Sequence, residues 1–297
     1  MVVDAPVLQA VSGPEFLPAD LNLWSKTRNV GLAFIENMEL ASRFVPNAKR
    51  YFDHIICGST WCAEELRKMG ISTSVALQGV DQGLFYPIEN KPKRGRYVIG
   101  SFGKFEYRKG QDVVIAAFSK LWSKDPQMHL LTSWGNLWPE TMRTMGSSNN
   151  IRFSYEPGKN WRELIENTMH VAGIPRDRYT LLDLRPHHEM PFIYHQCDVA
   201  VFANRVEAGT NLPLMECIAC GIPAICTDNT GHKDISGSAD VISNGSPEML
   251  AEQITQVKDK GVLRSSKRSF VEGLSWDNTA KSVFEAINNT ALKHDRL

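Results

Sequence analysis

The sequence lacks several features that would assign it to a class at once. No apolar run approaches the roughly 20 residues of a membrane-spanning helix. Its 33 basic residues are balanced by 33 acidic ones, so the net charge is zero. This balance argues against a nucleic-acid-binding protein that depends on a broad basic face. The N-terminus has no charged start followed by an apolar core, unlike a secretory signal. We expect a cytoplasmic protein.

Familiar cofactor and metal motifs are also missing. No Gly-x-Gly-x-x-Gly follows the first strand of either half, which argues against a Rossmann dehydrogenase. No Asp-x-Asp occurs anywhere in the chain. The one Cys-x-x-Cys, at Cys217 and Cys220, has no second pair and falls inside a predicted helix, so it favours packing over zinc or redox chemistry. The six cysteines are therefore expected to be reduced.

What the sequence does contain is a repeated alternation of short apolar runs and amphipathic segments. The 297 residues suffice for two domains. In residues 1–88 we predict strands over 6–11, 29–35, 52–57 and 73–77, with a helix over 60–69 capped by Ser59. This pattern is typical of the later half of a doubly wound domain, so the fold class is α/β with an incomplete first domain.

A polar, breaker-rich linker over 87–95 separates this region from a second domain at 96–270. There the predicted strands are 96–102, 129–133, 179–184, 198–204 and 240–243, with a further apolar run after Pro223. The predicted helices are 110–124, 161–171, 191–196, 212–220 and 247–258. The remaining residues, 271–297, read as a C-terminal helix that could cross back to the first domain.

Residues 207–216 form the most informative segment, because a loop of small residues joins a buried strand to a helix. Leu212, Met215 and Ala219 recur at helical spacing, and Gly221 ends the helix. In a doubly wound sheet such a loop lies at the carboxyl edge of the strands, where free amides and the helix dipole favour an anion. We therefore expect a phosphate site.

A second candidate loop, residues 103–110, follows the first strand of the second domain. It contains Lys104, Arg108 and Lys109 between Gly103 and Gly110. Cations at the carboxyl edge of a parallel sheet suit a diphosphate, since each can make a charge-assisted hydrogen bond. Taken alone, this loop is better interpreted as a solvated surface connection. Its place on the same sheet edge as the 207–216 loop favours the anion site.

Together these segments resemble the GT-B glycosyltransferases of the family 4-like group, the glycosyl transferases group 1. The resemblance rests on residues 101–104, 108–110 and 207–223, and on residues 52–61 and 79–87 of the first domain. It covers roughly residues 29–290. It implies two Rossmann-like doubly wound parallel-sheet domains and a retaining, metal-independent hexosyltransferase. UDP- or GDP-sugar is the expected donor, with no further cofactor.

The resemblance implies a role for each matching residue. Lys104 and Lys109, after Gly103, would neutralise the donor's diphosphate, and Glu207 would face the transferred sugar. Glu216 would accept hydrogen bonds from the ribose hydroxyls. The nucleobase would lie near Arg185. The remaining donor contacts would be amides of the second loop, at Gly209, Thr210, Asn211 and Leu212.

The sequence departs from the family pattern in two ways. Eight residues separate Glu207 from Glu216 instead of seven, so Ala208 occupies the position that a glutamate usually takes. The histidine that often faces the sugar in the first domain has no counterpart, because His54 lies within a predicted strand and reads as structural. These departures bear on Glu207 and on the acceptor side.

Two further segments allow more than one interpretation. His187, His188 and Glu189 resemble a metal cluster, but His195 completes no ligand spacing, so a solvated loop is the preferred interpretation. Residues 17–24 could dock on a membrane surface or a partner chain, or could equally belong to the core.

Two functions remain open at this point. The first is transfer of a sugar from a nucleotide-diphosphate sugar to a hydroxyl of an acceptor such as a glycan or glycolipid. The alternative is a nucleotide-sugar-binding module, or a subunit of a larger glycosyltransferase complex, without turnover of its own. The incomplete first domain motivates the alternative, whereas Lys104, Lys109 and Glu216 favour retained donor binding.

Overall fold

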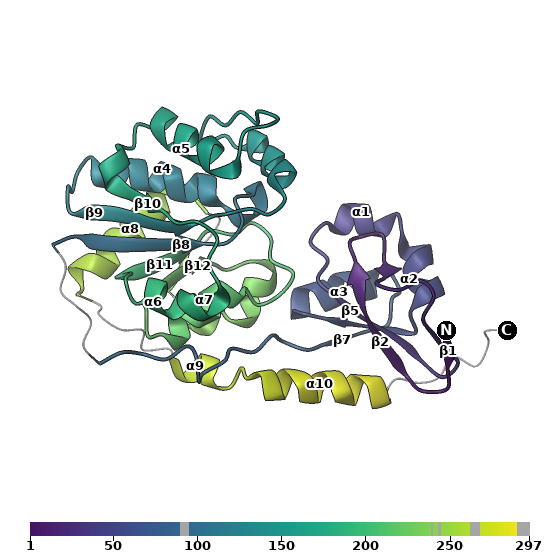
Figure 1. Ribbon diagram of the computed structural model, residues 1–297. Helices are drawn as coiled ribbons and strands as arrows, with labels where there is room; N and C mark the ends of the chain where they lie inside the picture. Colours follow the sequence, from purple (N-terminus) through teal and green to yellow (C-terminus); the bar gives the residue numbers. More distant parts are fainter. Residues whose placement is uncertain (90–94, 239, 243–244, 262–267, 290–297) are drawn as a thin grey trace. The chain divides into compact units, whose positions relative to one another are not determined.

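The computed structural model describes residues 1–89, 95–238, 240–242, 245–261 and 268–289. Contacts within the chain divide it into two compact units. Unit 1 comprises Met1–Gly79, Glu207–Asn211 and residues 273–289, and unit 2 comprises Val80–Val206 and the described residues of Leu212–Glu272. Both units are α/β, built on largely parallel sheets (Figure 1). This is the predicted fold class.

The sheet of unit 1 has the order β3-β2-β5-β6-β7. Four of its strands are parallel, and the two-residue β3 pairs antiparallel with β2. A separate two-stranded parallel sheet joins β1 to β4. The strands are β1 (Val2–Val3), β2 (Val7–Ser12), β3 (Leu17–Pro18), β4 (Trp24–Ser25), β5 (Asn29–Ala33), β6 (His54–Cys57) and β7 (Thr73–Val75).

Four helices belong to unit 1: α1 (Met38–Ser42), α2 (Val45–Tyr51), α3 (Thr60–Lys68) and α10 (Trp276–Asn289). The side chain of Ser59 caps α3 by accepting a hydrogen bond from the amide of Cys62 at 3.2 Å, as the sequence predicts. One face of the sheet packs on α3 through a buried cluster that includes Ile55, Cys62 and Leu66.

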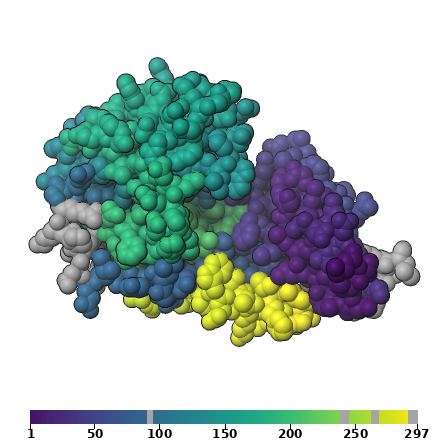
Figure 2. Space-filling view, in the orientation of Figure 1, coloured from purple at the N-terminus to yellow at the C-terminus, as the bar shows by residue number. Residues whose placement is uncertain are grey.

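Helix α10 covers apolar residues of unit 1 that lie far from it in the sequence. Val283, Ala286 and Ile287, spaced three and one residues apart on the helix, pack against Val30, Ile56 and Ala76. The hydroxyl of Thr279 donates to the carbonyl of Leu77 at 2.7 Å. Figure 2 shows the yellow C-terminal residues against the purple N-terminal residues of the same unit.

Unit 2 contains a six-stranded sheet, all parallel, in the order β10-β9-β8-β11-β12-β13. Its strands are β8 (Tyr97–Phe102), β9 (Met128–Ser133), β10 (Tyr179–Leu181), β11 (Val199–Phe202), β12 (Ala224–Thr227) and β13 (Asp240–Ile242). The chain enters at β8 in the middle, builds outward to β10, and then returns to build β11 to β13. The order therefore reverses between β8 and β11, where ligands bind in this class of sheet.

Helices cover both faces of this sheet, with α4 and α5 on the opposite side from α6 and α7 (Figure 1). The core cluster joins Val114 and Phe118 of α4, Leu164 of α5, and Ile254 of α8 to the strands. The helices are α4 (Gln111–Trp122), α5 (Trp161–Val171), α6 (Met190–Tyr194), α7 (Leu212–Ala219), α8 (Pro247–Asp259) and α9 (Arg268–Glu272).

The structure also shows the surroundings of the cysteines and of residues 17–24. All six cysteines are buried and none forms a disulfide, and burial raises the pKa of Cys217 and Cys220, which suits a packing role. In residues 17–24, Leu21 is exposed, whereas Trp24 packs its ring edge-on against Tyr51 at 6.3 Å. None of the helices in the described ranges is long and apolar enough to cross a membrane.

Candidate functional site

The basic loop after β8 is shaped by its two glycines. Gly103 and Gly110 have φ angles of 109° and 73°, in the region that favours glycine. A Cβ built on Gly110 would lie 1.9 Å from the carbonyl oxygen of Ala203, so only glycine fits there. Gly110 therefore lets the basic loop reach the residue that follows β11. The loop lies at the carboxyl ends of β8 and β11, where the strand order reverses.

Glu106 organises the cations of this loop. The residue is 6% exposed, and its carboxylate contacts Arg108 Nε at 2.8 Å, the Thr141 hydroxyl at 2.8 Å and Lys104 Nζ at 3.7 Å. Burial alone would raise the pKa of Glu106, but Arg108, the Thr141 hydrogen bond and the two lysines, Lys104 and Lys109, lower it. Glu106 is therefore ionised at neutral pH, and the three cations of the loop leave an excess of positive charge.

Lys104 is placed so that its ammonium is reachable. Its side chain is 40% exposed, and its Nζ lies over the ring of Trp138, 5.1 Å from the centroid. Such a cation–π contact orients the ammonium without covering it. Lys109 ends the single 3₁₀ turn Tyr107–Lys109, directly before Gly110 and α4.

A buried ion pair braces the loop from behind. Arg205 contacts both carboxylate oxygens of Asp112 at 2.7 Å, and Asp112 is fully buried. Arg205 also donates to the carbonyl of Tyr107 at 2.6 Å, and its backbone amide donates to the carbonyl of Arg108 at 2.7 Å. The guanidinium lies 3.9 Å from the centroid of the Tyr107 ring. This bidentate pair joins the segment after β11 to the basic loop.

The electrostatics of Asp112 support this bracing role. Burial would raise its pKa, but hydrogen bonds from Arg205, Ser148 and Asn150 lower it. Ser148 Oγ and Asn150 Nδ2 donate to Asp112 Oδ2 at 2.7 and 2.9 Å. The carboxylate is thus fully partnered, as a buried charge must be.

Glu216 lies in the middle of α7, and its side chain is 5% exposed. Its Oε2 accepts a hydrogen bond from the Tyr194 hydroxyl at 2.6 Å, and its Oε1 contacts His187 Nε2 at 2.7 Å. The His187 side chain is 64% exposed, whereas Tyr194 is buried. The carboxylate therefore has one exposed partner, His187, and one buried partner, Tyr194.

The loop before α7, Glu207–Asn211, belongs to unit 1 and is bonded to other residues of that unit. Ser59 Oγ donates to the carbonyl of Ala208 at 2.7 Å, and the amide of Thr210 donates to Gln78 Oε1 at 3.3 Å. Asn211 adopts φ 60° immediately before Leu212 begins α7. Glu207 is 8% exposed. The predicted contacts of Glu207, Gly209, Thr210, Asn211 and Leu212 with a donor stay predictions.

Arg185 follows β10 on an exposed loop and pairs with Glu189 at 3.6 Å, with 44% of its side chain exposed. Its predicted place beside the nucleobase also stays a prediction. The sequence favours a solvated loop for His187, two residues further on, but its hydrogen bond to Glu216 gives it a specific partner. His195 contacts the carbonyl of Tyr86 at 2.8 Å.

Most partners of the site are not predicted by the sequence. The residues that surround the predicted ones are Glu106, Asp112, Arg205, His187 and Tyr194. Arg205 and Asp112 are 93 residues apart. Nothing in local spacing pairs them. The one available signal was the position of Arg205, two residues before Glu207 at the end of a predicted strand.

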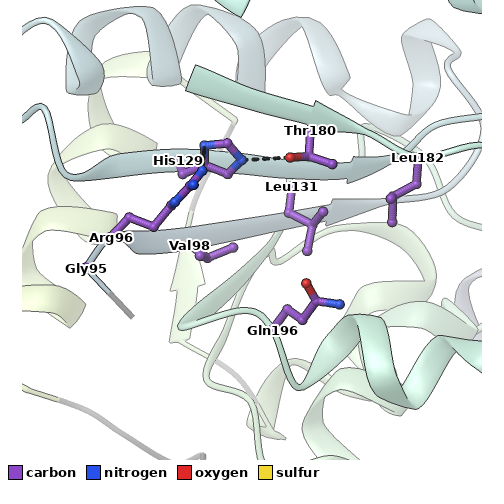
Figure 3. Close-up of a pocket in the computed structure, with 8 residues that line it drawn as sticks. All are labelled: Gly95, Arg96, Val98, His129, Leu131, Thr180, Leu182 and Gln196. Atoms are coloured by element: carbon purple, nitrogen blue, oxygen red, sulfur yellow. Dashed lines mark hydrogen bonds between the residues drawn. The ribbon is translucent and has the colours of Figure 1, made fainter. Parts of the chain in front are cut away.

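A hollow of about 500 Å³ lies over the same sheet near the starts of β8 and β9. Figure 3 shows His129 between Arg96 and Thr180, with Gln196 facing them from the segment after α6. Arg96 Nη1 contacts His129 Nδ1 at 3.0 Å, and His129 Nε2 contacts Thr180 Oγ1 at 2.9 Å. Burial and then Arg96 lower the pKa of His129 to about 4, so this imidazole is neutral at pH 7. The hollow is at the other end of the strands from the basic loop.

The two α/β units, with a parallel sheet whose strand order reverses in unit 2, define a Rossmann-like fold. A family model described as "Glycosyl transferases group 1" matches residues 86–272, more than half of the chain. The protein belongs to this family. A search of curated proteins found no match.

Solved structures show the same fold at low sequence identity. Sucrose-phosphate synthase from Thermosynechococcus elongatus has a TM-score of 0.68 and 18% identity over 88% of this chain and 67% of its own. HepE from Anabaena in complex with UDP-glucose has a TM-score of 0.69 and 15% identity over 88% and 72%. A UDP-forming trehalose-phosphate synthase from Burkholderia vietnamiensis has a TM-score of 0.68 and 9% identity over 89% and 66%. These structures have the GT-B fold.

Proposed function

We propose that this protein is a retaining glycosyltransferase that moves a sugar from a nucleotide-diphosphate sugar to an acceptor hydroxyl. The observation that carries the proposal is the basic loop of unit 2. Its cations are arranged around a buried, ionised Glu106 and are held by the Asp112–Arg205 pair. A preorganised cluster of positive charge is what a leaving diphosphate requires.

The donor is proposed to bind the second domain predicted from the sequence, residues 96–270. Lys104 and Lys109 neutralise the diphosphate, Glu216 accepts hydrogen bonds from the ribose, and the loop after β10 that carries Arg185 meets the base. The amides of Gly209, Thr210, Asn211 and Leu212 complete the phosphate and sugar contacts. UDP is the favoured nucleotide, because structures of similar fold are described with UDP-glucose or as UDP-forming.

In the proposed reaction the bond between the anomeric carbon and the diphosphate oxygen breaks, and its electron pair stays with the diphosphate. The acceptor oxygen forms the new bond on the same face of the sugar, and its proton passes to the departing phosphate. Lys104 and Lys109 stabilise the growing charge, so no metal ion is needed for that step. Glu207 faces the transferred sugar, and unit 1 supplies the acceptor contacts.

The basic loop provides the first test. Lys109→Ala should lower transfer or donor hydrolysis by about 100- to 1,000-fold, since one preorganised charge at the leaving group is removed. Lys124→Ala, an exposed lysine just beyond α4, is the matched control and should leave the rate unchanged. A radiolabelled UDP-, GDP- or ADP-sugar gives the rate. Equal activity of both variants would contradict the proposal.

A binding panel separates the enzyme from a non-catalytic module. A donor at about 100 times its dissociation constant should raise the free energy of unfolding by about 2.7 kcal/mol. Tight binding with no hydrolysis and no transfer to any acceptor extract would favour the module. Absence of binding by all three donors would exclude both.

A further inference from the structure

The carboxylate of Glu216 is held from two sides in different surroundings. Tyr194 donates to Oε2 from the core, where it packs edge-on against Phe102 at 4.8 Å. His187 contacts Oε1 from the solvent side and packs against Phe85 at 5.1 Å. Phe85 also lies 6.0 Å from the ring of Tyr194, so one buried aromatic side chain supports both partners.

The number of hydrogen bonds that the Glu216 carboxylate can still accept indicates which ligand group it could bind. An ionised carboxylate has about four lone-pair positions, two on each oxygen. Within the described part of the chain, Tyr194 uses one on Oε2 and His187 uses one on Oε1. One position on each oxygen is left, which matches the two neighbouring hydroxyls of a vicinal diol.

The two partners also fix the plane of the carboxylate. With one donor on each oxygen, the group cannot rotate about its last bond without losing both hydrogen bonds. Burial raises the pKa of the Tyr194 hydroxyl well above its usual range, and Glu216 raises it further, so Tyr194 stays protonated and donates. The remaining acceptor positions are therefore held in constant directions before any ligand arrives.

We propose that His187 and Tyr194 are positioning residues that orient Glu216 to recognise the vicinal diol of a nucleotide ribose. This inference rests on the proposed function and extends it to two residues outside the family motif. His187 has a second task, because a diol must approach the carboxylate from the exposed side that His187 borders. A preorganised acceptor gains affinity by avoiding the cost of ordering on binding.

The experiment compares two ligands that differ only in the diol. Dissociation constants of UDP and of 2′,3′-dideoxy-UDP are measured by calorimetry for the wild type, His187→Ala and Tyr194→Phe. Each substitution should weaken UDP binding about tenfold, the value expected for one hydrogen bond to a charged group. Neither should change the binding of the dideoxy nucleotide, so the preference for UDP falls.

Two further variants make the comparison selective. His188→Ala removes the neighbouring exposed histidine and should behave as the wild type. His187→Gln keeps an N–H near the position of Nε2 and should recover much of the UDP preference. Because His187 is exposed, its variants are expected to fold even if Tyr194→Phe does not.

The outcomes separate this inference from the proposed function. Equal weakening of both nucleotides, or no weakening of either, would overturn the positioning role while leaving donor binding intact. A wild type that binds UDP and dideoxy-UDP equally would also overturn it. A wild type that binds no nucleoside diphosphate, including GDP and ADP, would overturn the proposed function and this inference with it.

Discussion

The two units differ in what they bury. In Met1–Gly79 the buried polar side chains are all uncharged or neutral at pH 7, namely Gln9, Ser25, Asn29, His54 and Ser59. Unit 1 buries one carboxylate, Glu207 in the loop before α7, whereas the described residues of unit 2 bury three, Glu106, Asp112 and Glu216. Burying a charge is costly unless it is paired, so ionised groups are retained where their charge is used.

The contacts of these buried side chains also differ between the two units. In unit 1, Asn29 and Ser25 exchange two hydrogen bonds of 2.9 Å, and His54 lies between the hydroxyls of Ser72 and Ser74. These pairs join neighbouring strands and loops. In unit 2, Glu106 and Asp112 act on the basic loop, and Glu216 lies in the helix that the motif predicts. Buried charge therefore marks the candidate site better than any hollow does.

The largest expected effect comes from breaking the ion pair of unit 2. Arg205→Ala leaves the carboxylate of Asp112 buried without its cation, and should lower the free energy of unfolding by about 3–5 kcal/mol. Urea unfolding followed by tryptophan fluorescence measures the loss. Arg152→Ala, an exposed arginine in the same unit, is the control. A loss below about 1 kcal/mol would mean that the pair does not brace the loop.

Acid should affect both units, because each buries a neutral histidine. Burial lowers the pKa of His54 in unit 1, and the pKa of His129 in unit 2 falls to about 4 from the usual 6.5. For each histidine, between its lowered pKa in the folded protein and the usual value of 6.5, the unfolded chain binds more protons than the folded chain. Stability is therefore full above pH 6.5 and falls as the pH drops towards 4, by at most about 3 kcal/mol for His129.

His129→Gln should flatten this pH dependence, as measured by thermal unfolding between pH 4 and 7. His170→Gln, an exposed histidine at the end of α5, should leave the slope unchanged. Identical slopes for wild type and His129→Gln would show that His129 is not the group responsible.

The smallest effect tests the neutral pairs of unit 1. Asn29→Ala leaves the amide and carbonyl of Ser25 without their partners, and should cost about 1–3 kcal/mol. Asn47→Ala, whose side chain makes a single hydrogen bond to the carbonyl of Glu15, should cost less. If Asn29→Ala destabilised the protein more than Arg205→Ala, the contrast between the units would be lost.

Much of the fold was predictable from sequence, because local patterns set it. The helix over 161–171 has the predicted bounds, and the strands of unit 2 lie within about two residues of theirs, apart from the shorter β10. The missed elements are short: β1, β3, β4, α1 and α2 have two to seven residues each. Such segments are too short for a helical or strand periodicity of apolar residues to be recognised in the sequence.

The candidate site likewise contains residues that the sequence predicts and residues that it does not. Lys104, Lys109 and Glu216 were selected because each lies in a loop or helix with a local signature. Their supports were not, since the Tyr194 hydroxyl meets Glu216 across 22 residues and Arg205 meets Asp112 across 93. Pairing at such separations is decided by the sheet topology, which a single sequence does not give.

The return of α10 to unit 1 has a consequence for biosynthesis. The apolar face formed by Val30, Ile56 and Ala76 leaves the ribosome roughly 200 residues before Val283, Ala286 and Ile287, which cover it. At typical elongation rates that interval is about 10–40 s. Throughout it unit 1 exposes an apolar surface, whereas most of unit 2 is a continuous stretch that can fold as it emerges. Chaperone contact during synthesis is therefore expected at the segment Met1–Gly79.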